Sequence, residues 1–232
     1  MPIVSATSAP LPATSRGAVL RASLGVALIV GSSGIAFGAA AVAAGFSVAQ
    51  SCTLSLLAFS GASQFALIGV MGAGGSALSG IATAAFLGIR NGLYGMRMAP
   101  ILRVQGLMRI IAAHITIDES TGVAIAQEER GRAAMRWGFW FTGFGVFLFW
   151  NLFTLLGALG AQAMGNPAAW GLDAAVPALF LGIVWPRLTN SVDRTLAIAA
   201  MATSLLLTPF LPAGLPIIST ALLAIAVGVW KK

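Results

Sequence analysis

The sequence predicts an all-α integral membrane protein, and its composition and charge distribution support this first. Of the 232 residues, 58% are hydrophobic and only 8% are charged, and the mean hydropathy is +0.94. Soluble domains carry about 25% charged residues because their surfaces face water, so most of this surface must face lipid. Charged residues and histidine are absent from 22–89, 137–172 and 195–230. Each stretch can hold one or more bilayer-spanning helices of about 20 residues.

Helices fit these stretches better than the strands of a membrane barrel. In lipid a chain must satisfy its own backbone hydrogen bonds, which leaves helices or closed barrels. Barrel strands alternate polar and apolar residues over about 10 positions, and stretches such as 144–157 show no such alternation. The absence of alternation therefore favours helices over barrel strands.

About seven hydrophobic helical segments are expected, some of them discontinuous or re-entrant, with breaks at glycine and proline residues. Residues 1–17 are expected to form a disordered tail and residues 18–232 a single permease domain. Within that domain, 97–136 is expected to be a polar, amphipathic central connection. The expected segments are 20–43, 48–71, 75–96, 137–161, 171–187, 193–210 and 214–230.

The basic residues predict the orientation of these segments. Positive-inside bias places basic clusters in the cytoplasm, so we expect both termini to be cytoplasmic. This requires an even number of crossings between Arg21 and Arg97, where three segments lie. Either one of the three is broken or re-entrant, or residues 100–117 also enter the membrane. The basic clusters are Arg16 with Arg21, the 97–136 connection, Arg187 with Arg194, and Lys231 with Lys232.

Several functional classes are disfavoured by the sequence. The net charge of +7 suits nucleic-acid binding, but the basic residues lie between hydrophobic segments rather than in a stripe with aromatic residues. One histidine and one cysteine cannot build a familiar metal site. Nucleophile motifs and paired catalytic carboxylates are also missing. We therefore expect no enzyme, no cofactor and no bound metal, and we interpret Cys52 as a small buried hydrophobic residue.

The densest polar cluster inside a hydrophobic segment is Ser60-Gly61-Ala62-Ser63-Gln64. Lipid cannot satisfy such groups, so they should face a cavity or another helix. The small residues could instead serve close helix packing. The long amide of Gln64 favours a functional role.

A second cluster contains Arg90, Asn91 and Tyr94, with Arg90 and Tyr94 one helical turn apart on a shared face. Arg90 could bind a carboxylate or gate the cytoplasmic mouth. The alternative is an interfacial, snorkelling arginine beside an anchoring tyrosine.

Four titratable residues are candidates for proton coupling, because histidine titrates near neutrality and burial raises the pKa of carboxyl groups towards it. His114 and Asp118 are four residues apart, which predicts that they share one helical face, and Glu119 follows. The alternative for these residues is a solvated helix with a capping aspartate. Asp173, four residues before Pro177, is either an ion site in a broken helix or a helix cap. Residues 59–70 and 173–184 also resemble each other, which would suit a two-repeat transporter.

Five short motifs give the chain a family resemblance over about residues 18–230. On these motifs it resembles the AzlC/BrnF/YgaZ-like family, the large permease subunit of bacterial two-component branched-chain amino acid exporters. The motifs are GIAFG at 34–38, FSGASQF at 59–65, RNGLYG at 90–95, IDES at 117–120 and GLDAAVPALF at 171–180.

The resemblance implies proton-driven export of leucine, isoleucine and valine, with methionine as a further candidate, across the bacterial inner membrane. It also implies a small, hydrophobic AzlD/BrnE/YgaH-like partner subunit. The alternative is a scaffold subunit that only shapes a partner's pore. Proton coupling would fall to Asp118, Asp173, Glu119 or His114. The candidate substrate-binding residues are Phe59, Ser60, Gly61, Ser63, Gln64, Phe65, Arg90, Asn91, Tyr94 and Pro177.

Overall fold

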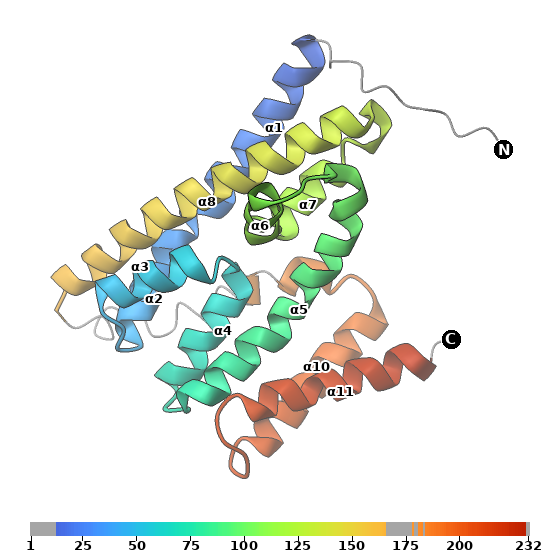
Figure 1. Cartoon of the computed structure of the whole chain (residues 1–232). Helices are drawn as coiled ribbons and strands as arrows, with labels where there is room; N and C mark the ends of the chain where they lie inside the picture. The colour runs from blue at the N-terminus through green and yellow to red at the C-terminus, as the bar shows by residue number, and fades with distance from the viewer. Residues whose placement is uncertain (1–12, 166–177, 179–180, 183, 231–232) are drawn as a thin grey trace. The chain divides into compact units, whose positions relative to one another are not determined.

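The computed structural model of the chain describes residues 13–165, 178, 181–182 and 184–230. These residues form helices and connections without a strand (Figure 1). Asp173 and Pro177 lie outside the described residues, as does most of the expected segment 171–187. The elements are α1 (Ala13–Ser32), α2 (Gly34–Ala43), α3 (Val48–Leu57), α4 (Gly61–Gly72), α5 (Ala77–Leu102), α6 (Leu107–His114), α7 (Asp118–Ile125), η1 (Glu128–Arg130), α8 (Arg132–Ala163), η4 (Trp185–Arg187), α10 (Ser191–Leu207) and α11 (Leu215–Trp230).

The helix boundaries differ from the sequence expectations in three places. Helix α1 begins at Ala13, so the end of the expected disordered tail is helical. The expected segment 48–71 is divided into α3 and α4. The expected polar connection 97–136 contains the last turns of α5, all of α6 and α7, and the first turn of α8. Hydropathy ends a segment at a charged residue, whereas the backbone hydrogen bonds of a helix continue through it.

Two helical stretches among the described residues are long and apolar enough to cross a membrane. They are Arg16–Ala43, which is α1 with α2, and Arg132–Ala163, which is α8. Large apolar side chains project from both, including Ile29 with 74% of its surface exposed and Leu148 with 64%. Such exposure fits a lipid solvent. The other expected crossings stay predictions.

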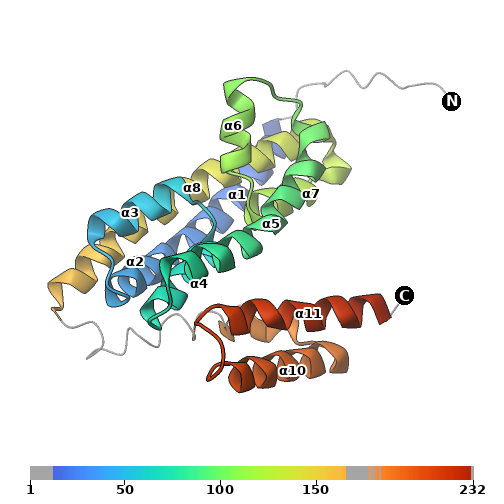
Figure 2. The same ribbon diagram turned by 60° about the horizontal axis from the view of Figure 1, so that its bottom comes forward.

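Contacts group the chain into two compact units, each made of two segments. The first unit comprises Met1–Gly34 with Ile89–Phe153, and the second comprises Ile35–Gly88 with Thr154–Lys232. Helices α5 and α8 contribute to both. In the second unit, α10 and α11 lie side by side in both views (Figures 1 and 2).

In the first unit, α1 packs in parallel along the first half of α8. The contacts advance together along both helices, from Val19 with Ala134 to Ala27 with Gly145. A side chain on Gly145 would come within 2.8 Å of the Ala27 Cβ, so glycine permits this close approach.

In the second unit, α2 packs against the last turns of α8 through a reciprocal pair of glycines. A Cβ on Gly38 would collide with the backbone carbonyl of Thr154, and one on Gly157 would collide with that of Ile35. Because both obstacles are backbone atoms, neither can rotate away. Gly38 belongs to a G-x-x-x-G pattern, which glycine-rich sequences often contain by chance. In this protein Gly38 does lie at a close contact between two helices, α2 and α8.

Helices α3 and α4 form a hairpin in the same unit. A capping box begins α3, in which the Ser47 hydroxyl accepts from the Gln50 amide at 3.1 Å and the Gln50 side chain accepts from the Ser47 amide at 2.8 Å. The chain turns at residues 58–60, and α4 then leaves at an angle to α3 (Figure 1). The end of α4 returns to Ala44, since a Cβ on Gly72 would lie 3.1 Å from the Ala44 Cβ.

Candidate functional site

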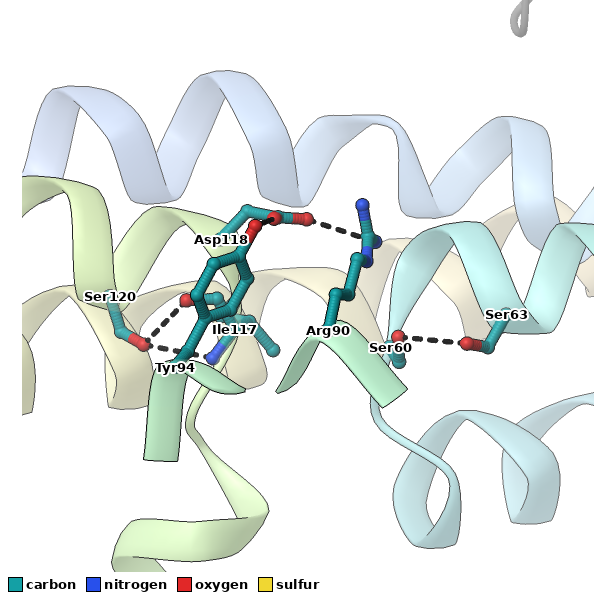
Figure 3. Close-up of polar contacts among 7 residues, drawn as sticks. All are labelled: Ser60, Ser63, Arg90, Tyr94, Ile117, Asp118 and Ser120. Atoms are coloured by element: carbon teal, nitrogen blue, oxygen red, sulfur yellow. Dashed lines mark hydrogen bonds and ion pairs between the residues drawn. The ribbon is translucent and has the colours of Figure 1, made fainter. Parts of the chain in front are cut away.

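The first candidate site is a charged cluster between α5 and α7. The Arg90 guanidinium nitrogen Nη2 lies 2.9 Å from Asp118 Oδ2, and the Tyr94 hydroxyl donates a 2.6 Å hydrogen bond to Asp118 Oδ1 (Figure 3). Arg90 and Tyr94 are one turn apart on α5, as the spacing predicts. Each carboxylate oxygen of Asp118 therefore has its own donor, and charge-assisted bonds of this kind are among the stronger ones in proteins.

A capped break between α6 and α7 delivers Asp118 to this position. The Ser120 hydroxyl accepts from the Ile117 amide at 3.0 Å (Figure 3). It also donates to the Ile115 carbonyl at 2.8 Å. The Thr116 hydroxyl donates to the Ala112 carbonyl at 2.6 Å. These bonds satisfy backbone groups at the two helix ends. Helix α7 thus begins with a carboxylate, which the positive end of its dipole favours.

Arg90 lies in the middle of α5 rather than near the end of a segment. Twelve residues separate it from Leu102, or about 18 Å along the axis. The Leu102 carbonyl accepts a hydrogen bond from Arg136 on the first turns of α8, and Leu102 packs with Met135 and Phe139. The end of α5 is therefore fixed beside the start of a membrane-length helix. The ion pair with Asp118 gives Arg90 a counter-ion within the protein, which argues against a snorkelling arginine.

Helices α6 and α7 pack along the first half of α8. The break between them contacts α8 farther from its start than the end of α7 does. Ile115 packs against Gly143, where a Cβ would lie 2.9 Å from the isoleucine Cδ1, and the His114 ring meets the Phe147 ring edge-on at 5.5 Å. Val123, near the end of α7, is back beside Gly138. His114 and the residues that follow it at the break therefore lie beside the middle of α8 rather than beside its basic first turns.

The neighbours of Asp118 fall into two groups. Glu119 is half-buried in the first turn of α7, and none of the ion pairs within the described residues includes it. The Asn91 side-chain oxygen is buried without a partner among those residues. His114 and Asp118 do not share a helical face, because α6 ends at one and α7 begins at the other. That interpretation of their four-residue spacing was wrong.

The second candidate site is the break between α3 and α4, in the other unit. Gln64 is 1% exposed, and its amide nitrogen donates to the carbonyls of Leu54 and Ser55 at 3.2 and 3.4 Å. Gln64 therefore caps the last turn of α3 from across the break. Its own oxygen Oε1 is buried and has no partner in the described part of the chain.

The N-terminus of α4 is partly buried and has no side-chain cap. Its N-cap residue Ser60 makes no capping bond, and its hydroxyl instead donates to the Ser63 hydroxyl at 3.2 Å (Figure 3). Ser60 and Ser63 are 9% and 8% exposed. The first backbone N–H groups of a helix have no partner within the helix, and a buried end needs other partners. This break therefore offers free donors beside one free acceptor.

Aromatic side chains complete the surroundings of this break. Phe59 and Phe65 are buried, and the Phe65 ring meets the Phe37 ring edge-on at 5.5 Å. A Cβ on Gly88 of α5 would lie 3.6 Å from the Ser63 hydroxyl, an ordinary contact. Polar groups in the break are thus set among apolar walls.

Sequence reasoning missed the buried hydroxyl residues that support both breaks. Ser120 was noticed only as part of a motif, and Ser55 and Thr154 were not noticed. The last two are fully buried, and the Ser55 hydroxyl donates to that of Thr154 across 3.4 Å. Partners 99 residues apart leave no local signal.

Asp193 is part of the helix cap at the start of α10. The Asn190 side chain accepts from the Asp193 amide at 2.9 Å and donates to its carboxylate at 2.7 Å. Among the residues that the structure describes, no group of three His, Cys, Asp or Glu residues could hold a metal ion.

Comparisons with known proteins identify the family. The model of the AzlC protein family matches residues 25–164, which is more than half of the chain and includes both candidate sites. The inner membrane protein YgaZ of Escherichia coli K12 is 31% identical over 157 residues, covering 64% of this chain and 63% of that protein. The match thus spans less than two thirds of that relative's length. No solved structure matches the chain.

The family resemblance expected from the sequence motifs is therefore confirmed. It indicates a membrane protein related to transport. Because the family model matches residues 25–164, which is more than half of the chain, the chain belongs to the AzlC protein family.

Proposed function

We propose that this chain is a secondary transporter that exports branched-chain amino acids across the bacterial inner membrane. It exchanges them for protons and works with a small hydrophobic membrane subunit of the AzlD type. Leucine, isoleucine and valine are the expected substrates, with methionine as a further one. The observation that carries the proposal is the buried break between α3 and α4, where an uncapped helix N-terminus lies beside the unpartnered Oε1 of Gln64.

A zwitterion suits the polar groups of this break. The backbone N–H groups at the start of α4 and the positive end of its dipole favour a carboxylate. Gln64 Oε1 can accept a hydrogen bond from an ammonium group, and the hydroxyls of Ser60 and Ser63 can do either. Broken helices serve transporters in this way. Phe59 and Phe65 provide apolar contact for a branched side chain.

Asp118 is the proposed proton-coupled carboxylate of the charged cluster, with Glu119 as the neighbouring alternative. While Asp118 is ionised, it holds Arg90 and Tyr94. Protonation would leave Arg90 as a charge without its partner, which is costly within a membrane. The guanidinium would then seek another anion or water. Proton binding would thereby change the contacts between α5 and α7.

Transport by the purified protein tests this proposal. The chain would be purified with its small partner and reconstituted into liposomes, and counterflow of labelled leucine, valine and lysine would be measured with and without a pH gradient. We expect gradient-stimulated uptake of leucine and valine but not of lysine. Absence of uptake by folded protein with its partner present would overturn the transport proposal. If replacement of Asp118 leaves the stimulation by the pH gradient intact and replacement of Gln64 leaves the affinity for leucine unchanged, a scaffold subunit would be favoured.

A further inference from the structure

The two arms of the α3–α4 hairpin start and end beside the same point of the chain. Helix α3 begins at Val48, four residues after Ala44, and a Cβ on Gly72 at the end of α4 would lie 3.1 Å from the Ala44 Cβ. Four residues span at most about 15 Å. The end of α4 therefore lies within about 20 Å of the start of α3.

A membrane crossing by this segment would need a very different geometry. If residues 48–72 formed one continuous helix, its ends would be about 36 Å apart. The observed arms have 10 and 12 residues, or about 15 and 18 Å each. Each arm alone covers only about half of a hydrocarbon core of about 30 Å. Two arms of this length could enter the membrane to that depth and return.

The flanking helices decide on which face the hairpin opens. The span Arg16–Ala43 carries the chain from the first basic residues to Ala44. Helix α5 has 26 residues, about 39 Å, and leads from the end of α4 back to the basic stretch that begins at Arg97. Basic residues mark one face of the membrane.

We propose that α3–α4 is a re-entrant hairpin that opens on the membrane face opposite the basic residues. The chain then crosses twice between Arg21 and Arg97, once by α1–α2 and once by α5. This gives the even number that the charge distribution requires. The parallel contact of α1 with α8 agrees with this, because it requires an even number of crossings between the starts of the two helices.

The inference goes beyond the proposed function, because it holds whatever the protein transports. It also assigns a side to the break: Ser60 and Gln64 at the hairpin tip are separated from the outer face by one arm's length. A polar turn at this depth is tolerated where it is buried in protein or lines a water-filled cavity.

Cysteine labelling of the full chain in membranes, with its partner co-expressed, tests the hairpin. Cys52 is the single native cysteine, so a Cys52→Ala background carries one new thiol at a time. Three exposed residues are suitable for the new thiol. The variants are Ala49→Cys at the start of α3, Ala73→Cys just after α4 and Gln105→Cys in the basic stretch. A membrane-impermeant maleimide would be applied to spheroplasts and to inverted vesicles. Labelling in detergent gives the total for each variant.

We expect Ala49→Cys and Ala73→Cys to react in spheroplasts and to lose this reaction in inverted vesicles, with Gln105→Cys showing the opposite pattern. Ala77→Cys at the exposed start of α5 provides a second reporter if Ala73→Cys disturbs the helix end. Labelling of positions 49 and 73 or 77 from opposite faces would show that α3–α4 crosses the membrane and would overturn the proposal.

Discussion

Replacement of Gln64 by leucine tests the binding role of the α3–α4 break most directly. The change keeps a buried side chain of similar size but removes both halves of the amide. Loss of the nitrogen leaves the carbonyls of Leu54 and Ser55 without that donor, and both bonds are long, at 3.2 and 3.4 Å. We expect the protein to lose about 1–2 kcal/mol of stability from this. It should still fold.

Loss of Oε1 should act on the ligand instead. A hydrogen bond to a charged group contributes about 1.5–3 kcal/mol, so leucine should bind about 10- to 150-fold more weakly. The assay is inhibition of labelled leucine counterflow by unlabelled leucine and by 4-methylpentanoate, which has the same branched chain and carboxylate but no ammonium. The advantage of leucine over this analogue should shrink by that factor.

The control for this comparison is Gln162→Leu, the same substitution at an exposed position of α8. It should leave both inhibition constants unchanged. If Gln64→Leu weakens leucine and 4-methylpentanoate equally, Gln64 only caps α3 and the assignment of Oε1 to the ammonium is refuted.

Three further predictions concern the charged cluster and the helix contacts. Asp118→Asn should abolish stimulation of leucine uptake by a pH gradient while counterflow continues, and retained stimulation would exclude Asp118 as the coupling group. Gly157→Ala should lower the unfolding temperature of the detergent-solubilised protein, because its Cβ collides with the Ile35 carbonyl, whereas Gly160→Ala, with open space around it, should not. Ser120→Ala should lower that temperature by removing hydrogen bonds worth about 1 kcal/mol each, and Ser120→Thr should restore it. If Ser120→Thr lowers the unfolding temperature as much as Ser120→Ala does, the Ser120 hydroxyl is not the group that stabilises this turn.

Local patterns were sufficient to predict the helical class and the break between α3 and α4. Glycine, serine and glutamine interrupt a hydrophobic run at 59–65, and α4 does begin at Gly61. The Arg90–Tyr94 spacing correctly placed both residues on one face of a helix. Each of these features depends on residues within about two turns of one another.

Nonlocal pairing could not be predicted from one sequence. Asp118 was grouped with His114 because they are four residues apart, but its partner Arg90 is 28 residues away, beyond a turn that the pattern did not reveal. Hydropathy ends the segment near residue 96 and so puts Arg90 near its end, while α5 continues to Leu102. A charged residue that finds its counter-ion does not have to end a helix.

The hydrogen bond between Ser55 and Thr154 has a consequence for biogenesis. The ribosome makes α3 almost 100 residues before α8, so the hydroxyl of Ser55 has no such partner when α3 leaves the translocon. Helices α1 and α2 together are apolar and long enough to insert alone, but neither short arm of the hairpin is. We therefore expect the two arms to stay near the translocon or the lipid surface until α8 is made. Truncation before α8 should leave this region open to protease, while the first span is already inserted.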